Sequence, residues 1–204
     1  MESQENHKLL YYGLLRKIKP YLEGDILDYG CGTGLISNAL RSLAKENSKI
    51  SAYDGLETGE HFSSEKFEET KKNLKSEIKL YESKQELPKA FFDTVLLLCM
   101  LHGNHYIIEQ CSPYIKTRGY LIVLDHDKSH LSNEEFLAWL TDADRKEINE
   151  RSLDAVMYDH RKMKLEDCCR IGKENGYETI KFWNHKTLSQ RYPFYLWIGQ
   201  KIYD

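Results

Sequence analysis

One short stretch, residues 24–34, limits what this chain of 204 residues can fold into. It reads G-D-I-L-D-Y-G-C-G-T-G, which is a brief apolar strand, an acidic residue (Asp28) near its end, and the alternating glycines Gly30, Gly32 and Gly34. Because glycine has no Cβ, such a backbone turns sharply and comes within contact distance of a ligand. A helix-like pattern follows at once, and the free N–H groups of its first turn point at whatever occupies the glycine turn. The stretch therefore predicts a strand, a ligand-binding turn and a helix, in that order.

A second acidic residue meets an independent requirement of such a site. Residues 49–53 read as a strand that ends at Asp54, twenty positions beyond Gly34. In a strand–turn–helix–strand unit, an acid at the end of the second strand accepts hydrogen bonds from both hydroxyls of a ribose. The alternative is an Asp that merely ends a strand or caps the next helix. The spacing favours the ribose role.

The spacing of the three glycines and the position of Asp28 resemble the first motif of the class I methyltransferases that use S-adenosylmethionine (SAM), in which the form D-x-G-C-G-T-G is common. The glycine spacing is G-x-G-x-G, preceded by Asp28, and differs from the dinucleotide-binding G-x-G-x-x-G. The resemblance implies that SAM is the cofactor and S-adenosylhomocysteine the product. It also implies a set of residues that line SAM: Asp28, Gly30, Cys31, Gly32, Thr33, Gly34, Asp54, Gly55, Leu56, Ser83 and Cys99.

One position departs from the pattern of that family, at the end of the third predicted strand, residues 78–81. The acid that contacts the adenine amino group in the family aligns with Ser83, although the Leu87-Pro88 that follows does fit the pattern. Adenine recognition then falls to the Ser83 hydroxyl, to Glu82 or to backbone groups.

The rest of the chain predicts strands and helices in alternation. Residues 91–102 form the most apolar segment, and a continuous run of this kind predicts a strand covered on both faces, central in a parallel sheet. A fifth strand over 119–125 and two closing strands over 177–183 and 193–203 follow. This order resembles the seven-stranded Rossmann-like methyltransferase sheet, in which the last strand is antiparallel. We therefore predict one α/β domain over residues 1–204, a three-layer α/β/α sandwich.

Two helical segments lie outside this alternation. Residues 1–23 predict an N-terminal helix that covers the cofactor. Residues 127–164 are polar and helix-prone, and predict a lid inserted over the ligand edge of the sheet. The lid starts with a capping box, in which Ser132 is the N-cap and Glu135 stands three residues on. A last helix is predicted to end at Gly176, as the αL glycine that commonly terminates a helix.

Histidines at strand ends predict the acceptor side of the site. His102 follows the fourth predicted strand and His126 the fifth, and open α/β sheets bind ligands at that edge. Methyl transfer is an in-line displacement that needs alignment more than acid–base power. A base is needed only where the acceptor must lose a proton, and an ordinary histidine pKa of about 6.5 suits that task. The alternative is that both residues orient backbone or cap helices.

Metal assistance is a further alternative for the same edge. Asp125, His126 and Asp127, together with His102 and His130, offer carboxylate and imidazole ligands. No pair of them has an established ligand spacing, so we expect no metal.

Composition and the absence of two motifs narrow the range of expected substrate classes. Charged residues make up 30% of the chain and its formal net charge is −3, so it lacks the basic excess of proteins that follow a phosphate backbone. Residues 99–102 stand where amino-methylating DNA enzymes carry [DNS]-P-P-[YFW]. Residues 111–113 are similar to a cysteine-nucleophile motif but fall within a helix predicted over 106–116. We therefore expect a small-molecule acceptor and no nucleic acid partner.

The sequence also predicts where the protein resides. The first residues are acidic or amide-bearing where a secretory signal needs a basic start. The longest apolar run, 95–101, is far shorter than the roughly 20 residues that span a bilayer. The five cysteines are irregularly spaced, which favours reduced thiols over a disulfide framework. We expect a cytoplasmic protein with no membrane partner, and the sequence leaves its oligomeric state open.

Together these features predict a SAM-dependent methyltransferase that acts on O, N or S of a small polar metabolite. One alternative is a protein or RNA methyltransferase, in which the lid would be a docking surface. Another is a SAM-binding scaffold with no turnover. Because one fold hosts many chemistries, the sequence leaves the acceptor itself open.

Overall fold

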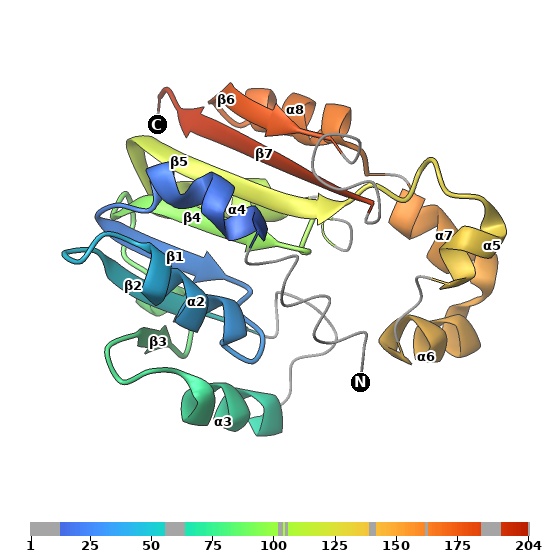
Figure 1. Ribbon diagram of the computed structural model, residues 1–204, viewed down its shortest axis with the longest axis horizontal. Helices are drawn as coiled ribbons and strands as arrows, with labels where there is room; N and C mark the ends of the chain where they lie inside the picture. Colours follow the sequence, from blue (N-terminus) through green and yellow to red (C-terminus); the bar gives the residue numbers. More distant parts are fainter. Residues whose placement is uncertain are drawn as a thin grey trace.

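Seven strands form one sheet in the order β3-β2-β1-β4-β5-β7-β6 (Figure 1). The computed structural model describes residues 13–55, 64–101, 104, 106–138, 142–161, 163–184 and 193–203. The strands are β1 (Asp25–Tyr29), β2 (Lys49–Tyr53), β3 (Lys79–Tyr81), β4 (Phe92–Leu98), β5 (Ile115–His126), β6 (Tyr177–Trp183) and β7 (Phe194–Lys201). Strand β7 pairs antiparallel with both β5 and β6, whereas the pairs among β1 to β5 are parallel. The predicted sheet with its antiparallel last strand is confirmed.

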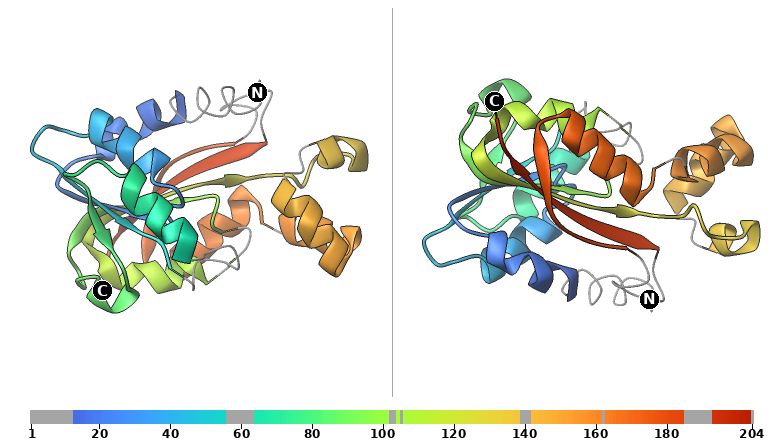
Figure 2. Two further views of the ribbon diagram at one scale, coloured as in Figure 1. Left: turned by 90° about the horizontal axis from the view of Figure 1, so that it is seen from below. Right: turned by 90° about the horizontal axis from the view of Figure 1, so that it is seen from above.

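Helices connect the strands and cover both faces of the sheet. They are α2 (Leu35–Leu43), α3 (Ser64–Asn73), α4 (Ile107–Cys111), α5 (Asn133–Ala138), α6 (Asp142–Arg151), α7 (Leu153–Arg161) and α8 (Leu165–Glu174), with short 3-10 turns at Lys19–Tyr21, Lys84–Glu86 and Ser112–Tyr114. Figure 2 shows α8, in orange, on the opposite side of the sheet from α2. Gly176 follows α8 with a φ of +83°, as predicted for a terminating glycine.

Two hydrophobic cores, one on each face, hold the layers together. Successive residues of a strand point to opposite faces, and in β4 Leu96 joins one core while Val95 and Leu97 join the other. The core around Leu96 includes Leu40 of α2, and the other includes Cys168 of α8. All five of these side chains are fully buried. The three-layer α/β/α sandwich is therefore confirmed.

The N-terminal segment packs on the face that α2 covers. Residues 13–18 are helical, and Leu14, Leu15, Ile18 and Leu22 are buried in the same core as α2. Residues 1–12 lie outside the described part of the chain. The predicted covering of the cofactor by residues 1–23 therefore stays a prediction, while the described part contributes to the core.

The predicted helix over 106–116 is wrong at its carboxyl end. Helix α4 stops at Cys111, a 3-10 turn carries Pro113, and β5 begins at Ile115 instead of Gly119. Proline has no N–H to continue a helix, and Ile115 instead pairs with Phe92 of β4.

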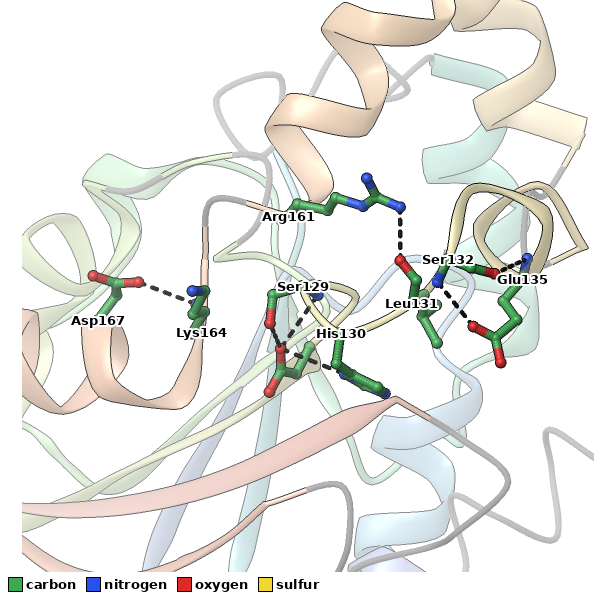
Figure 3. A network of polar contacts seen from close by, with 9 residues as sticks. Ser129, His130, Leu131, Ser132, Glu135, Arg161, Lys164 and Asp167 are labelled. Atoms are coloured by element: carbon green, nitrogen blue, oxygen red, sulfur yellow. Dashed lines mark hydrogen bonds and ion pairs between the residues drawn. The ribbon is translucent and has the colours of Figure 1, made fainter.

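Three short helices, α5 to α7, lie beyond the carboxyl end of β5 (Figure 1). The predicted capping box is present, because Glu135 N–H donates to Ser132 Oγ at 3.2 Å and Ser132 N–H donates to the Glu135 carboxylate at 2.8 Å. Figure 3 shows this pair beside Arg161 of α7, which donates to the Leu131 carbonyl at 2.8 Å. Phe136 is fully buried in a small core of its own, against which Leu131 packs. Within the part of the chain that the structure describes, we find no helix with the length and hydropathy of a membrane span.

Candidate functional site

The glycine turn after β1 is fixed by backbone contacts to the end of β2. The N–H groups of Gly30 and Cys31 both donate to the Tyr53 carbonyl, at 2.7 and 3.1 Å, and Gly34 N–H donates to the Cys31 carbonyl at 3.0 Å. Gly30, Gly32 and Gly34 have φ angles of +85°, +52° and +79°. Side chains other than glycine rarely adopt this region, so the conformation of the turn explains all three glycines.

The three glycines differ in what lies over them. A Cβ added to Gly30 would stand 2.6 Å from Met100 Sδ, and one added to Gly34 would stand 2.7 Å from Leu74 Cδ2. Gly32 is exposed, and an added Cβ would meet nothing within 4 Å. Gly30 and Gly34 therefore admit close packing within the protein. Gly32 is the position where open space reaches the backbone, which fits the close approach of a cofactor.

Asp54 lies next to that open position. It is half-buried just past β2, and its Oδ2 accepts a hydrogen bond of 2.7 Å from Gly32 N–H. A carboxylate offers about four acceptor positions, so this contact leaves capacity for the hydroxyls of a ribose. The structure thus brings together the two strongest predictions from the sequence, Gly32 and Asp54.

Helix α3 supports the turn from outside, a role that the sequence does not signal. The buried Thr70 donates through Oγ1 to the Gly32 carbonyl at 2.5 Å, and Asn73 Nδ2 donates to the Thr33 carbonyl at 3.4 Å. In the sequence, α3 is a highly charged segment of the kind expected on the surface. Its contacts with the turn come from two short polar side chains, which do not stand out among the many charges. A Thr and an Asn spaced three apart would not single out this helix in advance.

Asp28 lies beneath the turn, where its side chain contacts another residue of the chain. Its side chain is 1% exposed, and its Oδ2 accepts a 2.6 Å hydrogen bond from Ser37 Oγ of α2. Burial raises the pKa of Asp28 from 3.8 to about 6, the bond from Ser37 opposes the rise, and the charge of Asp54 adds to it. No described group hydrogen-bonds its Oδ1. Asp28 therefore joins β1 to α2, and a contact with the cofactor stays a prediction.

The adjacent cysteine is not set up for chemistry. Cys31 is buried, and burial raises the pKa of its thiol well above the usual range, helped by the charges of Asp28 and Asp54. Since the thiolate is the nucleophilic form, Cys31 acts here as a small core residue of the turn.

A second cluster forms where β4 and β5 end side by side. Asp125 is fully buried, and its carboxylate accepts two backbone hydrogen bonds of 2.6 Å, from Leu101 N–H after β4 and from His126 N–H. Cys99 follows β4 with a φ of +56°, and its N–H donates to the Leu124 carbonyl at 2.7 Å. Asp125 thus ties the two strand ends together.

His126 is held against this carboxylate. Its ring packs on Phe194 of β7 with centroids 4.5 Å apart, and its Nδ1 lies 3.6 Å from Asp125 Oδ1. The other predicted acceptor-side residue, His102, lies outside the described residues. Of the other residues weighed as metal ligands, Asp127 accepts a 2.6 Å hydrogen bond from Ser129 Oγ and lies 4.0 Å from His130 Nδ1.

Both clusters lie at one edge of the sheet. In the parallel register Tyr29 stands opposite Tyr53 and Leu97, and Leu98 stands opposite Leu124. The carboxyl ends of β1, β2, β4 and β5 are therefore neighbours, at the edge where open α/β sheets bind ligands.

Solved structures superpose on this chain over most of its length. The chain has the class I methyltransferase fold. A SAM-dependent methyltransferase from Methanosarcina mazei superposes with a TM-score of 0.63 at 15% identity, over 92% of this chain and 97% of that one. An S-adenosylmethionine-dependent methyltransferase from Mesorhizobium loti gives 0.63 at 13% identity, over 94% and 97%. One from Aquifex aeolicus gives 0.60 at 15% identity, over 88% and 84%. No protein-family model and no curated protein matches the chain.

The remaining predicted cofactor residues differ in their burial and in their contacts. Gly55 is buried, and an added Cβ would stand 2.3 Å from Tyr53 Oη, so packing explains this glycine. Ser83 is half-buried at the end of β3, whereas Glu82 is exposed and pairs with Lys71 at 3.6 Å. Thr33 is exposed on the turn and Cys99 is half-buried, and Leu56 lies outside the described residues.

Proposed function

We propose that this protein is a SAM-dependent methyltransferase that transfers the methyl group to O, N or S of a small polar metabolite. The observation that carries the proposal is the open backbone at Gly32, hydrogen-bonded to Asp54 at the ligand edge of the sheet. The likeness in fold to SAM-dependent methyltransferases supports it.

We assign a binding position to each part of the cofactor. The methionine part lies over the glycine turn, because Gly32 leaves room there. The ribose hydroxyls donate to the Asp54 carboxylate, and Ser83 lies at the adenine end. When bound, SAM supplies a methyl group on a sulfonium. The protein then has to hold the acceptor in line with that group. Such alignment lowers the activation barrier by about 7–11 kcal/mol.

The acceptor side is assigned to the ends of β4 and β5. Of the two histidines proposed to face the acceptor, His126 is among the residues that the structure describes and His102 is not. An amine or hydroxyl acceptor needs a base there, whereas a carboxylate or thiolate does not. The net charge of −3 argues against an extended phosphate backbone as the acceptor.

Calorimetry with SAM and with S-adenosylhomocysteine tests the cofactor assignment. We expect binding of both, and an Asp54→Ala variant that loses about 1.5–3 kcal/mol of binding free energy, since a charge-assisted hydrogen bond contributes that much. Glu174→Ala is the matched control, because its carboxylate is exposed on α8 beside Arg170 and belongs to no predicted cofactor contact. Absence of binding to either compound would overturn the proposal.

Activity separates the proposal from its alternatives. Binding of SAM without methylation of a broad acceptor panel would favour a scaffold. Methylation of RNA with strong salt dependence would favour a nucleic-acid substrate, because phosphate contacts release counterions.

A further inference from the structure

The structure places three potential metal ligands together at the acceptor side of the sheet edge. Cys99, Asp125 and His126 each offer one ligand atom, and these atoms all lie within 4.8 Å of one another. The three residues come from the ends of two neighbouring strands. Sequence spacing does not reveal such a group, because Cys99 is far from the other two along the chain.

We propose that Cys99, Asp125 and His126 bind one zinc ion. A thiolate, an imidazole nitrogen and a carboxylate oxygen are the ligands that zinc takes in proteins, whereas magnesium and calcium take oxygen. Ligand atoms at tetrahedral zinc distances of about 2.0–2.3 Å are about 3.3–3.7 Å apart. The cluster therefore has to tighten by about 1.5 Å or less, which rotation of the Cys99 and His126 side chains can supply.

The surroundings of the carboxylate suit a metal ligand. Two backbone N–H groups hold Asp125 in place at 2.6 Å each, and carboxylates that bind metals are themselves hydrogen-bonded in this way. Phe194 packs against the His126 ring and so limits its orientation. Asp125 is fully buried, while Cys99 and His126 are partly exposed.

Three protein ligands leave the fourth zinc position for water or for an O, N or S atom of a small ligand. With the metal bound, His126 serves as a ligand and not as a base. The proposal does not rest on methyl transfer, because zinc binding is measured without SAM.

The test is a zinc titration of the chelator-treated full chain, in competition with a chromophoric chelator. We expect one zinc per chain, and with cobalt in place of zinc a thiolate-to-cobalt charge-transfer band. Removing a group that is hydrogen-bonded to a metal ligand costs roughly 10–100-fold in metal affinity. Cys99→Ser and His126→Gln remove a ligand itself, so each should weaken zinc binding by more than that. Cys169→Ser is the matched control, because that half-buried thiol lies on α8 outside the cluster, and it should bind zinc as the wild type does.

Alkylation of thiols gives an independent measurement. Zinc should slow the reaction of iodoacetamide with Cys99 and leave the rate at Cys169 unchanged. Less than stoichiometric zinc, unchanged zinc affinity in a folded Cys99→Ser variant, or no protection of Cys99 would overturn the proposal. Calorimetry with SAM is read separately, so failure of the zinc site and failure of the cofactor assignment are distinguishable.

Discussion

The two halves of the ligand edge are held by different kinds of group. In the donor half, residues 30–34 and Asp54, the turn is fixed mainly by peptide groups, above all the Tyr53 carbonyl that accepts from Gly30 and Cys31. In the acceptor half, Cys99, Asp125 and His126, the buried Asp125 side chain joins the strand ends, beside one backbone bond from Cys99 N–H to the Leu124 carbonyl. Backbone contacts survive most substitutions, while side-chain contacts do not. Chains only 13–15% identical to this one share its fold, as expected where contacts depend little on the side chain.

Two alanine variants should give the largest effects and test the donor half. Gly34→Ala should destabilise the fold by about 3–4 kcal/mol, because its positive φ costs about 1–2 kcal/mol and the Cβ would overlap Leu74. Gly32→Ala has only the φ cost, but should reduce SAM affinity at least about 100-fold. Urea unfolding and calorimetry measure the two losses. If both variants lost only stability, Gly32 would not face the cofactor.

Asp125→Asn tests whether one side chain organises the acceptor half. An amide has a single acceptor oxygen, so either Leu101 N–H or His126 N–H loses its partner. We expect a loss of about 2–3 kcal/mol in the free energy of unfolding. Affinity for SAM should stay within about threefold of the wild type, because the donor half does not depend on this carboxylate. A large loss of SAM affinity in the folded variant would show that the two halves are coupled.

Asp28→Asn tests the cost of the buried acid beneath the donor half. Because the folded-state pKa is raised from 3.8 to about 6, the stability that this group contributes is complete below pH 3.8 and is lost as pH rises to about 6. The asparagine stays neutral and keeps an acceptor for Ser37. The variant should therefore match the wild type near pH 4 and exceed its stability by about 3 kcal/mol at about pH 7 and above. Urea unfolding at several pH values measures the difference, and parallel curves for the two proteins would contradict it.

Ser132→Ala should give the smallest effect, at the start of α5 in the predicted lid. Loss of the N-cap bond to Glu135 N–H should destabilise α5 by about 1 kcal/mol. Hydrogen exchange should then be about fivefold faster for the α5 amides and unchanged for those of β1. Faster exchange in both would indicate that α5 and the sheet unfold together.

Patterns of neighbouring residues were enough to predict much of the molecule. Strands β2 and β6 begin and end at the predicted residues, because apolar alternation and flanking turn residues are local signals. The glycine turn, Asp54 and the capping box at Ser132 were predicted for the same reason. The end of α4 was not, because a helical pattern was extended past Pro113.

A few residues close together in the chain and the order of the strands were enough to predict the glycine turn and the position of Asp54 at the end of β2. Tertiary structure decided what each glycine faces, that Thr70 supports the turn, and that Asp125 joins Leu101 to His126. It also decided the group formed by Cys99, Asp125 and His126. These contacts join residues distant in sequence, and only the packing of the strands brings them within a few ångströms of one another.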